Sequence, residues 1–351
     1  MKKAGTKTML TAGIKKGITL VELLVVFSLI AIMGGIGLGI WSHSGKQVGF
    51  QAQRGEINAM IQLVQTMARI EKRSVSLTVD PAAKEAYYIT KKTYGQWHFE
   101  DYITATDTTT GAFGLNGQLS GPITVTANGY VGSGLFLENI PNSSSPCCRI
   151  NKIPLLNRAE GLMVELAIYP TLMAQGLNLV ILYKNGGFSL MLTENDSIRL
   201  TFGESAVSTT ANTIRCQRWT PLCFMFEPDV YGQVQSNGKL SLYLNGVLQD
   251  QLLNVAKLAG EDPITIGASE GGPPFIGMVD ELRISGLNKS DPVKFEPADT
   301  VISVTMVDGS PSPLTPPFTL VINKDGYLAG GSVRLRFSSN SLHDSFEVVI
   351  K

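Results

Sequence analysis

The sequence predicts a mainly β protein that begins with one long helix. Hydrophobic residues make up 44% of the 351 residues, which excludes a disordered chain. Charged residues make up only 17%, and 36 residues are glycine, as is typical of half-buried strands joined by tight turns. Asn-Gly and Asp-Gly pairs, which supply the positive φ angles of hairpin turns, recur in the second half of the chain.

The helix is predicted from an apolar run over residues 18–40, whose one charge is Glu22. The run is long enough to cross a bilayer and too long for a secretory signal. Residues 1–17 hold five lysines and no acidic residue, which predicts a single-pass membrane anchor. Its N-terminus would be cytoplasmic and its body outside the cytoplasm. A carboxylate in such a span is costly, so Glu22 is a candidate functional residue.

The stretch GITLVELLVV, residues 17–26, resembles the cleavage and methylation motif of type IV prepilins. The resemblance implies that a prepilin peptidase cuts after Gly17 and N-methylates Ile18, where the family usually has Phe. It also implies that Glu22 pairs with the new amino group of a neighbouring subunit during assembly. The partners implied are prepilin peptidase and other pilin or pseudopilin subunits, and the location implied for the anchor is the bacterial inner membrane.

Beyond the apolar run, residues 41–72 are predicted to continue the helix with one buried face. Ile57, Ile61, Val64 and the pair Met67 and Ala68 recur there at helical spacing, with polar residues between them.

The pattern changes to strands after residue 73. Residues 74–79, 86–90 and 97–103 are predicted strands. Residues 239–253 predict a hairpin around Asn245-Gly246, and no later helix is expected.

The central block, residues 104–295, resembles the concanavalin A-like jelly roll of the laminin-G type. The residues that carry the resemblance are GYVGSGLFLEN (129–139), Trp219, LYLNG (242–246), ITIG (264–267) and FIGMVDELRIS (275–285). It assigns structural roles to Trp219, Tyr243, Asn245, Gly246, Gly277 and Asp280. It implies a glycan or protein ligand, and Asp280 is interpreted as a hydrogen-bonding acid at a strand end or next to calcium.

The last segment predicts a hairpin over residues 318–337 and a final strand over 346–351. These strands resemble those of the H-type minor pseudopilins. The jelly roll is therefore expected to be inserted in a pilin-type β head; the alternative is three domains in a row. The predicted domains are a cleaved leader (1–17), a transmembrane or filament-core helix (18–40), its amphipathic continuation (41–72), a β head (73–103 plus 296–351) and the jelly roll (104–295).

No catalytic group, metal site or cofactor is predicted. None of the three histidines has a Cys, Asp or Glu at metal-ligand spacing; they are His43, His98 and His343. No ligand cluster supports calcium. Asp280 and Glu281 are adjacent, so on a strand they point to opposite faces and do not flank one glycosidic bond. The formal net charge of zero gives no basic footprint for nucleic acid.

Four cysteines, Cys147, Cys148, Cys216 and Cys223, follow the predicted span. Outside the cytoplasm disulfides persist, so the adjacent pair is expected to bond to Cys216 and Cys223. The alternative is buried free thiols.

The sequence thus predicts a prepilin-like minor pilin or pseudopilin that displays a laminin-G-like binding domain and is not an enzyme. One alternative is a type II secretion pseudopilin whose inserted domain selects cargo. The other is a membrane-anchored enzyme acting on glycans.

Overall fold

The structure is a computed structural model that describes residues 20–71, 74–100, 116–138, 145–172, 176–231, 236–258, 262–267, 272–296, 299–308, 316–329 and 331–351. The chain divides into two compact units, one of residues 1–86 with 293–351 and one of residues 87–292. Residues 87–97, expected in the head, belong to the second unit, because the strand that contains them pairs there with β16.

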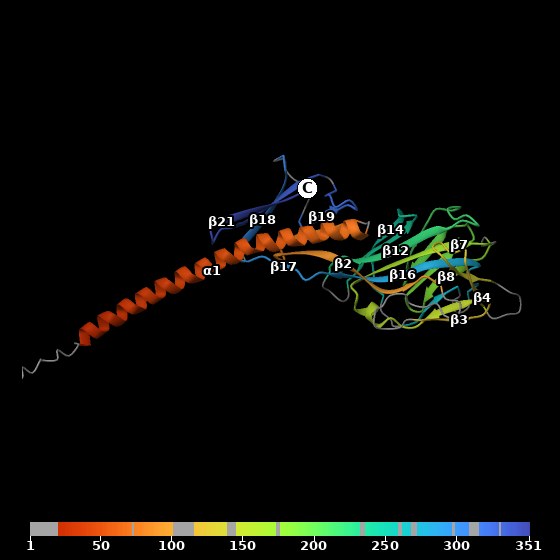
Figure 1. Ribbon diagram of the computed structural model, residues 1–351, viewed down its shortest axis with the longest axis horizontal. Coiled ribbons are helices and arrows are strands. Elements are labelled where there is room, and N and C mark those ends of the chain that lie inside the picture. Colours follow the sequence, from red (N-terminus) through yellow and green to blue (C-terminus); the bar gives the residue numbers. More distant parts are fainter. Residues whose placement is uncertain are drawn as a thin grey trace, which may run out of the picture. The chain divides into compact units, whose positions relative to one another are not determined.

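The unit of residues 87–292 is a sandwich of two antiparallel sheets (Figure 1). The first sheet contains β2 (Glu85–Trp97), β4 (Ile123–Thr126), β5 (Gly134–Leu137), β7 (Gly161–Pro170), β12 (Thr220–Pro228), β13 (Gly238–Leu244), β14 (Val247–Val255) and β16 (Gly277–Lys289). The second contains β3 (Gly117–Ser120), β6 (Cys147–Ile150), β8 (Leu179–Lys184), β9 (Phe188–Leu192), β10 (Ile198–Phe202), β11 (Ser205–Ser208) and β15 (Ile264–Ile266). A short 3₁₀ helix, η1 (Pro154–Arg158), precedes β7.

The core of this unit lies between the two sheets, because each strand sends alternate side chains inward. Leu222, Phe224 and Phe226 of β12 are buried, while the residues between them are half-exposed. Phe224 meets Phe188 of the second sheet edge to face, with ring centroids 5.0 Å apart. The inward residues therefore hold the sheets together and leave the outer faces free for polar groups.

The predicted hairpin of residues 239–253 is present as β13 and β14. Asn245 and Gly246 form its turn with φ angles of +51° and +77°, the left-handed values that a two-residue turn requires.

The other unit combines the helix α1 (Leu20–Glu71) with short antiparallel strands. Its strands are β1 (Val75–Asp80), β17 (Val293–Lys294), β18 (Thr300–Met306), β19 (Phe318–Ile322), β20 (Val333–Ser339) and β21 (Asp344–Ile350). Of the residues at helical spacing, Ile57, Ile61, Val64 and Ala68 are buried and Met67 is half-buried. They lie in the part of α1 that packs against this unit's strands, among them β1, β19 and β21 (Figure 1).

Two strand predictions are corrected. Residues 98–100 do not form the predicted third strand, because β2 ends at Trp97 and Phe99 has a φ angle of +52°, and residues 101–103 lie outside the described residues. Residues 318–337 do not form a hairpin, since β19 pairs with β1 while β20 pairs with β18 and β21. The Asp325-Gly326 turn exists, but it leads from one sheet to another.

The membrane prediction is also corrected. Within the part of the chain that the structure describes, no helix is both long and apolar enough to cross a lipid bilayer. The predicted single-pass inner-membrane anchor over residues 18–40 is therefore wrong. Beyond residue 45, the buried side chains of α1 instead form one apolar face, which packs on strands. The residues between them are mostly polar.

Candidate binding groove

A row of five polar or aromatic side chains crosses the outer face of the first sheet. Antiparallel pairing places Gln96, Arg283, Glu165, Cys223 and Tyr243 side by side, one from each of β2, β16, β7, β12 and β13. Their neighbours along the strands are core residues, so alternation turns the row away from the core. The row brings together residues that are distant in the sequence.

A groove of about 320 Å³ lies over part of this row. We call it the outer groove; its lining residues are Tyr130, Val131, Glu165, Leu166, Ala167, Pro221, Leu222, Cys223, Gly246, Glu281 and Arg283. Its volume is at the lower end of the range of about 300–1,000 Å³ for small-molecule sites.

Two carboxylates of the outer groove have basic partners. Lys91 Nζ lies 2.7 Å from Glu165 Oε2. Glu281 Oε1 accepts a hydrogen bond from His98 Nδ1. The amide of Gln96 donates to the other ring nitrogen of His98 at 2.9 Å, which makes Nδ1 the protonated nitrogen.

Arg283 is in a different position from the other charged residues. It is half-buried and stands opposite Glu165 in the register of β16 and β7. Its side chain makes no hydrogen bond or ion pair with any residue that the structure describes. Its guanidinium is thus available to a ligand.

The wall that carries Tyr130 and Val131 is held in place by a buried acid. The Asp280 carboxylate accepts the backbone N–H groups of Val131 at 3.0 Å and of Glu281 at 2.7 Å. Burial raises the pKa of Asp280 to about 6, although these N–H groups act in the opposite direction. Glu100 adds a second tie by accepting the N–H of Ser133 at 3.2 Å.

Tyr130 also belongs to a small aromatic cluster. Its ring centroid is 5.8 Å from that of Trp219, which in turn is 5.4 Å from Tyr169. Tyr130 is 47% exposed and Val131 is 57% exposed, so both present apolar surface beside the groove. The cluster supports the Tyr130 ring from one side.

The sequence-predicted motif residues surround this site in different roles. Gly246 lines the outer groove, Tyr243 lies in the cross-strand row, and Trp219 supports Tyr130. Gly277, with a φ angle of +149°, begins β16 where a Cβ would lie 2.3 Å from the carbonyl oxygen of Tyr169. Asp280 is the hydrogen-bonding acid of the loop, and no group of three or more metal-ligating side chains occurs among the described residues.

Sequence reasoning did not select Arg283, Glu165, Lys91 or Tyr130 as site residues. Arg283 and Tyr130 do stand within the quoted motifs, but strand register places Arg283 beside Glu165, and the hydrogen bond of Val131 to Asp280 places the loop with Tyr130. Gly17 and Ile18 lie outside the described residues, as does the side chain of Glu22.

The cysteines are free thiols in the structure, so the predicted disulfides are not present. Cys147 and Cys148 lie on β6 of the second sheet, whereas Cys223 is on the outer face of the first. The Cys216 thiol contacts the carbonyl oxygen of Thr171 at 3.0 Å instead. For Cys223 and the adjacent pair, placement on different sheets prevents the close Cβ approach that a disulfide needs.

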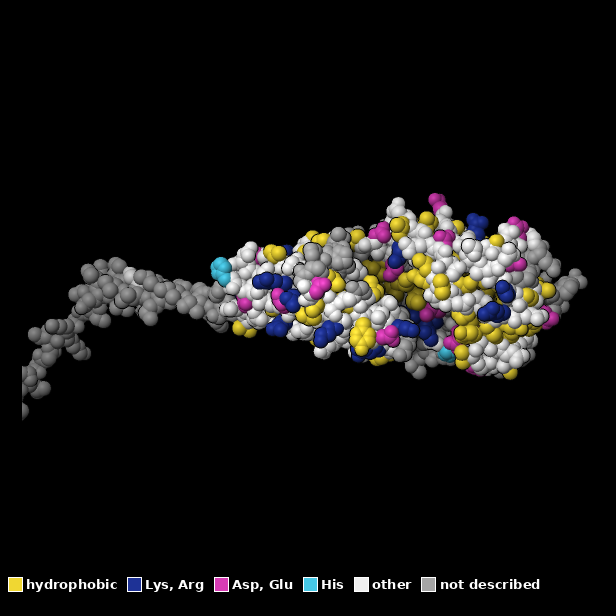
Figure 2. All heavy atoms as spheres, turned by 90° about the horizontal axis from the view of Figure 1, so that it is seen from above, with side chains coloured by type: hydrophobic (Ala, Val, Ile, Leu, Met, Phe, Trp, Pro, Cys, Tyr) yellow, Lys and Arg dark blue, Asp and Glu magenta, His cyan; other side chains and the backbone are white. Residues whose placement is uncertain are grey.

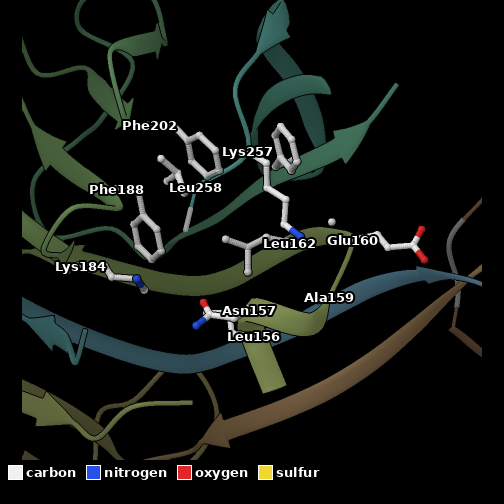
Figure 3. Close-up of a pocket in the computed structure, with 12 residues that line it drawn as sticks. Leu156, Asn157, Ala159, Glu160, Leu162, Lys184, Phe188, Phe202, Lys257 and Leu258 are labelled. Carbon is white, nitrogen blue, oxygen red and sulfur yellow. The ribbon is translucent and has the colours of Figure 1, made fainter. Parts of the chain in front are cut away.

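A second cavity, between Phe188, Phe202 and Leu258, is much smaller (Figure 3). Its volume is about 30 Å³, enough for only one or two water molecules. Lys184 and Lys257 both line it, and burial lowers the pKa of each. The outer groove is therefore the better candidate site.

Charge is mixed over the face of the molecule seen in Figure 2, where basic and acidic side chains are interspersed. The charged side chains visible there therefore do not form a broad field of one sign.

Residues 154–291 match the model of the concanavalin A-like lectin/glucanases superfamily. The predicted jelly roll is thereby confirmed. No curated protein matches the chain in sequence.

Solved structures resemble the chain at low identity. The fourth domain of AbnA, an extracellular arabinanase from Geobacillus stearothermophilus solved with arabinotriose, has 20% identity, covering 56% of this chain and 93% of its own, with a TM-score of 0.43. The receptor-binding domain of botulinum neurotoxin mosaic serotype C/D has 10% identity, covering 73% of this chain and 72% of its own, also with a TM-score of 0.43.

Proposed function

We propose that the sandwich of residues 87–292 is a binding domain that holds a glycan in the outer groove. The observation that carries the proposal is the composition of this groove, which sets an exposed aromatic wall beside charged hydrogen-bonding groups. A sugar ring has an apolar face of C–H groups and a rim of hydroxyls. Tyr130 and Val131 suit the former, while Glu165, Glu281 and Arg283 suit the latter. The family match, whose description includes lectins, supports this.

We favour binding over catalysis because the groove's carboxylates are already engaged. Glu165 is held by Lys91 and Glu281 accepts a hydrogen bond from His98. A glycosidase needs one carboxyl free to donate a proton and a second to act as nucleophile or base.

Changing Tyr130 to alanine is expected to weaken glycan binding about tenfold, or ~1.4 kcal/mol, because the sugar loses its aromatic wall. The measurement is binding of the purified full chain to a glycan array, followed by titration of the best ligand. Tyr327→Ala removes a tyrosine of the other unit that is exposed at 59%, against 47% for Tyr130, and is the matched control. Unchanged binding by Tyr130→Ala would exclude the outer groove as the site.

A second proposal concerns the N-terminus, which we infer is that of a type IV pilin-like subunit. The motif over residues 17–26 supports it, as does a long helix that begins at Leu20 and continues into a packed β unit. In this proposal the sandwich is the part that such a subunit displays.

Coexpression with a prepilin peptidase is expected to remove residues 1–17 and to add one methyl group at Ile18. Intact-mass measurement reads both changes. Gly17→Val should block cleavage, since the peptidase motif requires the glycine, whereas Gly13→Ala should be cut normally. A full-length mass for the unaltered chain would contradict the proposal.

A further inference from the structure

The charges of the outer groove differ in how far they are already satisfied. Glu165 and Lys91 form an ion pair, and Glu281 is hydrogen-bonded to His98. The Arg283 guanidinium has five N–H donors and no hydrogen-bond partner among the residues that the structure describes. Arg283 is therefore the charged group of the groove with the most hydrogen-bonding capacity left for a ligand.

The position of Arg283 increases what its side chain gains from binding a ligand. It is half-buried between core residues of β16 and lines the groove beside the half-buried Glu165. A guanidinium that has lost part of its water gains most from a planar acceptor that takes two parallel N–H bonds at once. A carboxylate has this geometry, whereas a sugar hydroxyl accepts only single bonds.

We propose that Arg283 binds the carboxylate of an acidic sugar, a uronic acid residue, in the outer groove. The inference rests on the proposed glycan-binding function and names its ligand class. The sugar ring then lies against Tyr130 and Val131, and Arg283 fixes its orientation.

The other charges limit the ligand to few negative groups. Glu165 and Glu281 line the same groove, and with Lys91 and Arg283 the four formal charges sum to zero. One added carboxylate contacts the guanidinium directly and brings this sum only to −1, whereas a densely sulfated chain or a nucleic acid would bring many negative charges close to the two carboxylates. The small volume of the groove also favours one sugar unit over an acidic peptide.

The test compares a galacturonic acid trimer with its methyl ester, using calorimetry on the purified full chain. The ester keeps the size and the hydroxyls but removes the charge. The unaltered protein should bind the acid at least tenfold more tightly than the ester. Arg283→Met should remove this preference while keeping the weaker binding of the ester. Arg283→Lys should restore only part of it, because lysine keeps the charge but lacks the planar fork.

Arg199→Met, at an exposed position on β10 of the second sheet, is the matched control and should behave like the unaltered protein. Thermal unfolding of each variant shows whether it is folded.

Three outcomes would overturn the inference. Equal binding of acid and ester, or binding of neutral glycans alone, would refute the acidic ligand while leaving the proposed function intact. Arg283-dependent binding of a tetraglutamate peptide without binding of the uronate would assign the site to a peptide. Failure to bind any glycan would refute the proposed function as well.

Discussion

Replacing Asp280 with alanine is expected to lower the free energy of unfolding by about 3 kcal/mol. The carboxylate is fully buried and accepts the N–H groups of Val131 and Glu281. Without it these donors lack a partner away from water, at about 1–3 kcal/mol for each. Urea unfolding measures the change, followed by the fluorescence of Trp219. This ring contacts Tyr130, which is in the loop that Asp280 holds.

The control for this prediction is Asp280→Asn, which keeps an acceptor oxygen and should recover most of the stability. The alanine variant should also lose glycan affinity, because the wall with Tyr130 and Val131 is no longer held. An alanine variant as stable as the unaltered protein would show that Asp280 does not organise the loop.

The same carboxyl gives the stability a pH dependence of defined sign. Its pKa in the folded protein, about 6, lies above the ordinary value of 3.8, so the folded state binds the proton more tightly. The stability gained when the folded protein binds a proton at Asp280 is fully present below about pH 3.8. It is lost as the pH rises through about 6, by about 3 kcal/mol in all. Asp280→Asn should lack this part of the pH profile.

The parts of the fold that the sequence predicts correctly are those set by local chemistry. The turn at Asn245-Gly246 follows from two residues that tolerate positive φ, and the buried face of α1 follows from helical spacing. The jelly roll itself is predicted by the order of several weak motifs. None of these needs knowledge of distant pairing.

Two features that the sequence did not predict depend on distant pairing. The Asp325-Gly326 turn looks like a hairpin turn, yet β19 pairs with β1 from the other end of the chain. The outer groove is built in the same way, since Arg283 and Glu165 come together only through the register of β16 and β7. Alternation tells which side chains face outward, but not which of them become neighbours.

Changing Phe224 to alanine is expected to destabilise the sandwich by about 3–5 kcal/mol, because it leaves a cavity where the two sheets meet. Phe224 is fully buried and its ring packs against Phe188 of the opposite sheet. Urea unfolding measures the loss. Met225→Ala, the next residue on the same strand, faces outward and should cost about 1 kcal/mol or less.

This pair of variants also separates the core from the site. Phe224 points into the sandwich, whereas its neighbour Cys223 lines the outer groove on the other face of β12. Molecules of Phe224→Ala that are folded at low temperature should therefore bind glycan with nearly unchanged affinity. Weakening of binding in step with stability would mean that the two faces of the sheet are coupled, and that the groove is shaped by core packing rather than by the Asp280 loop.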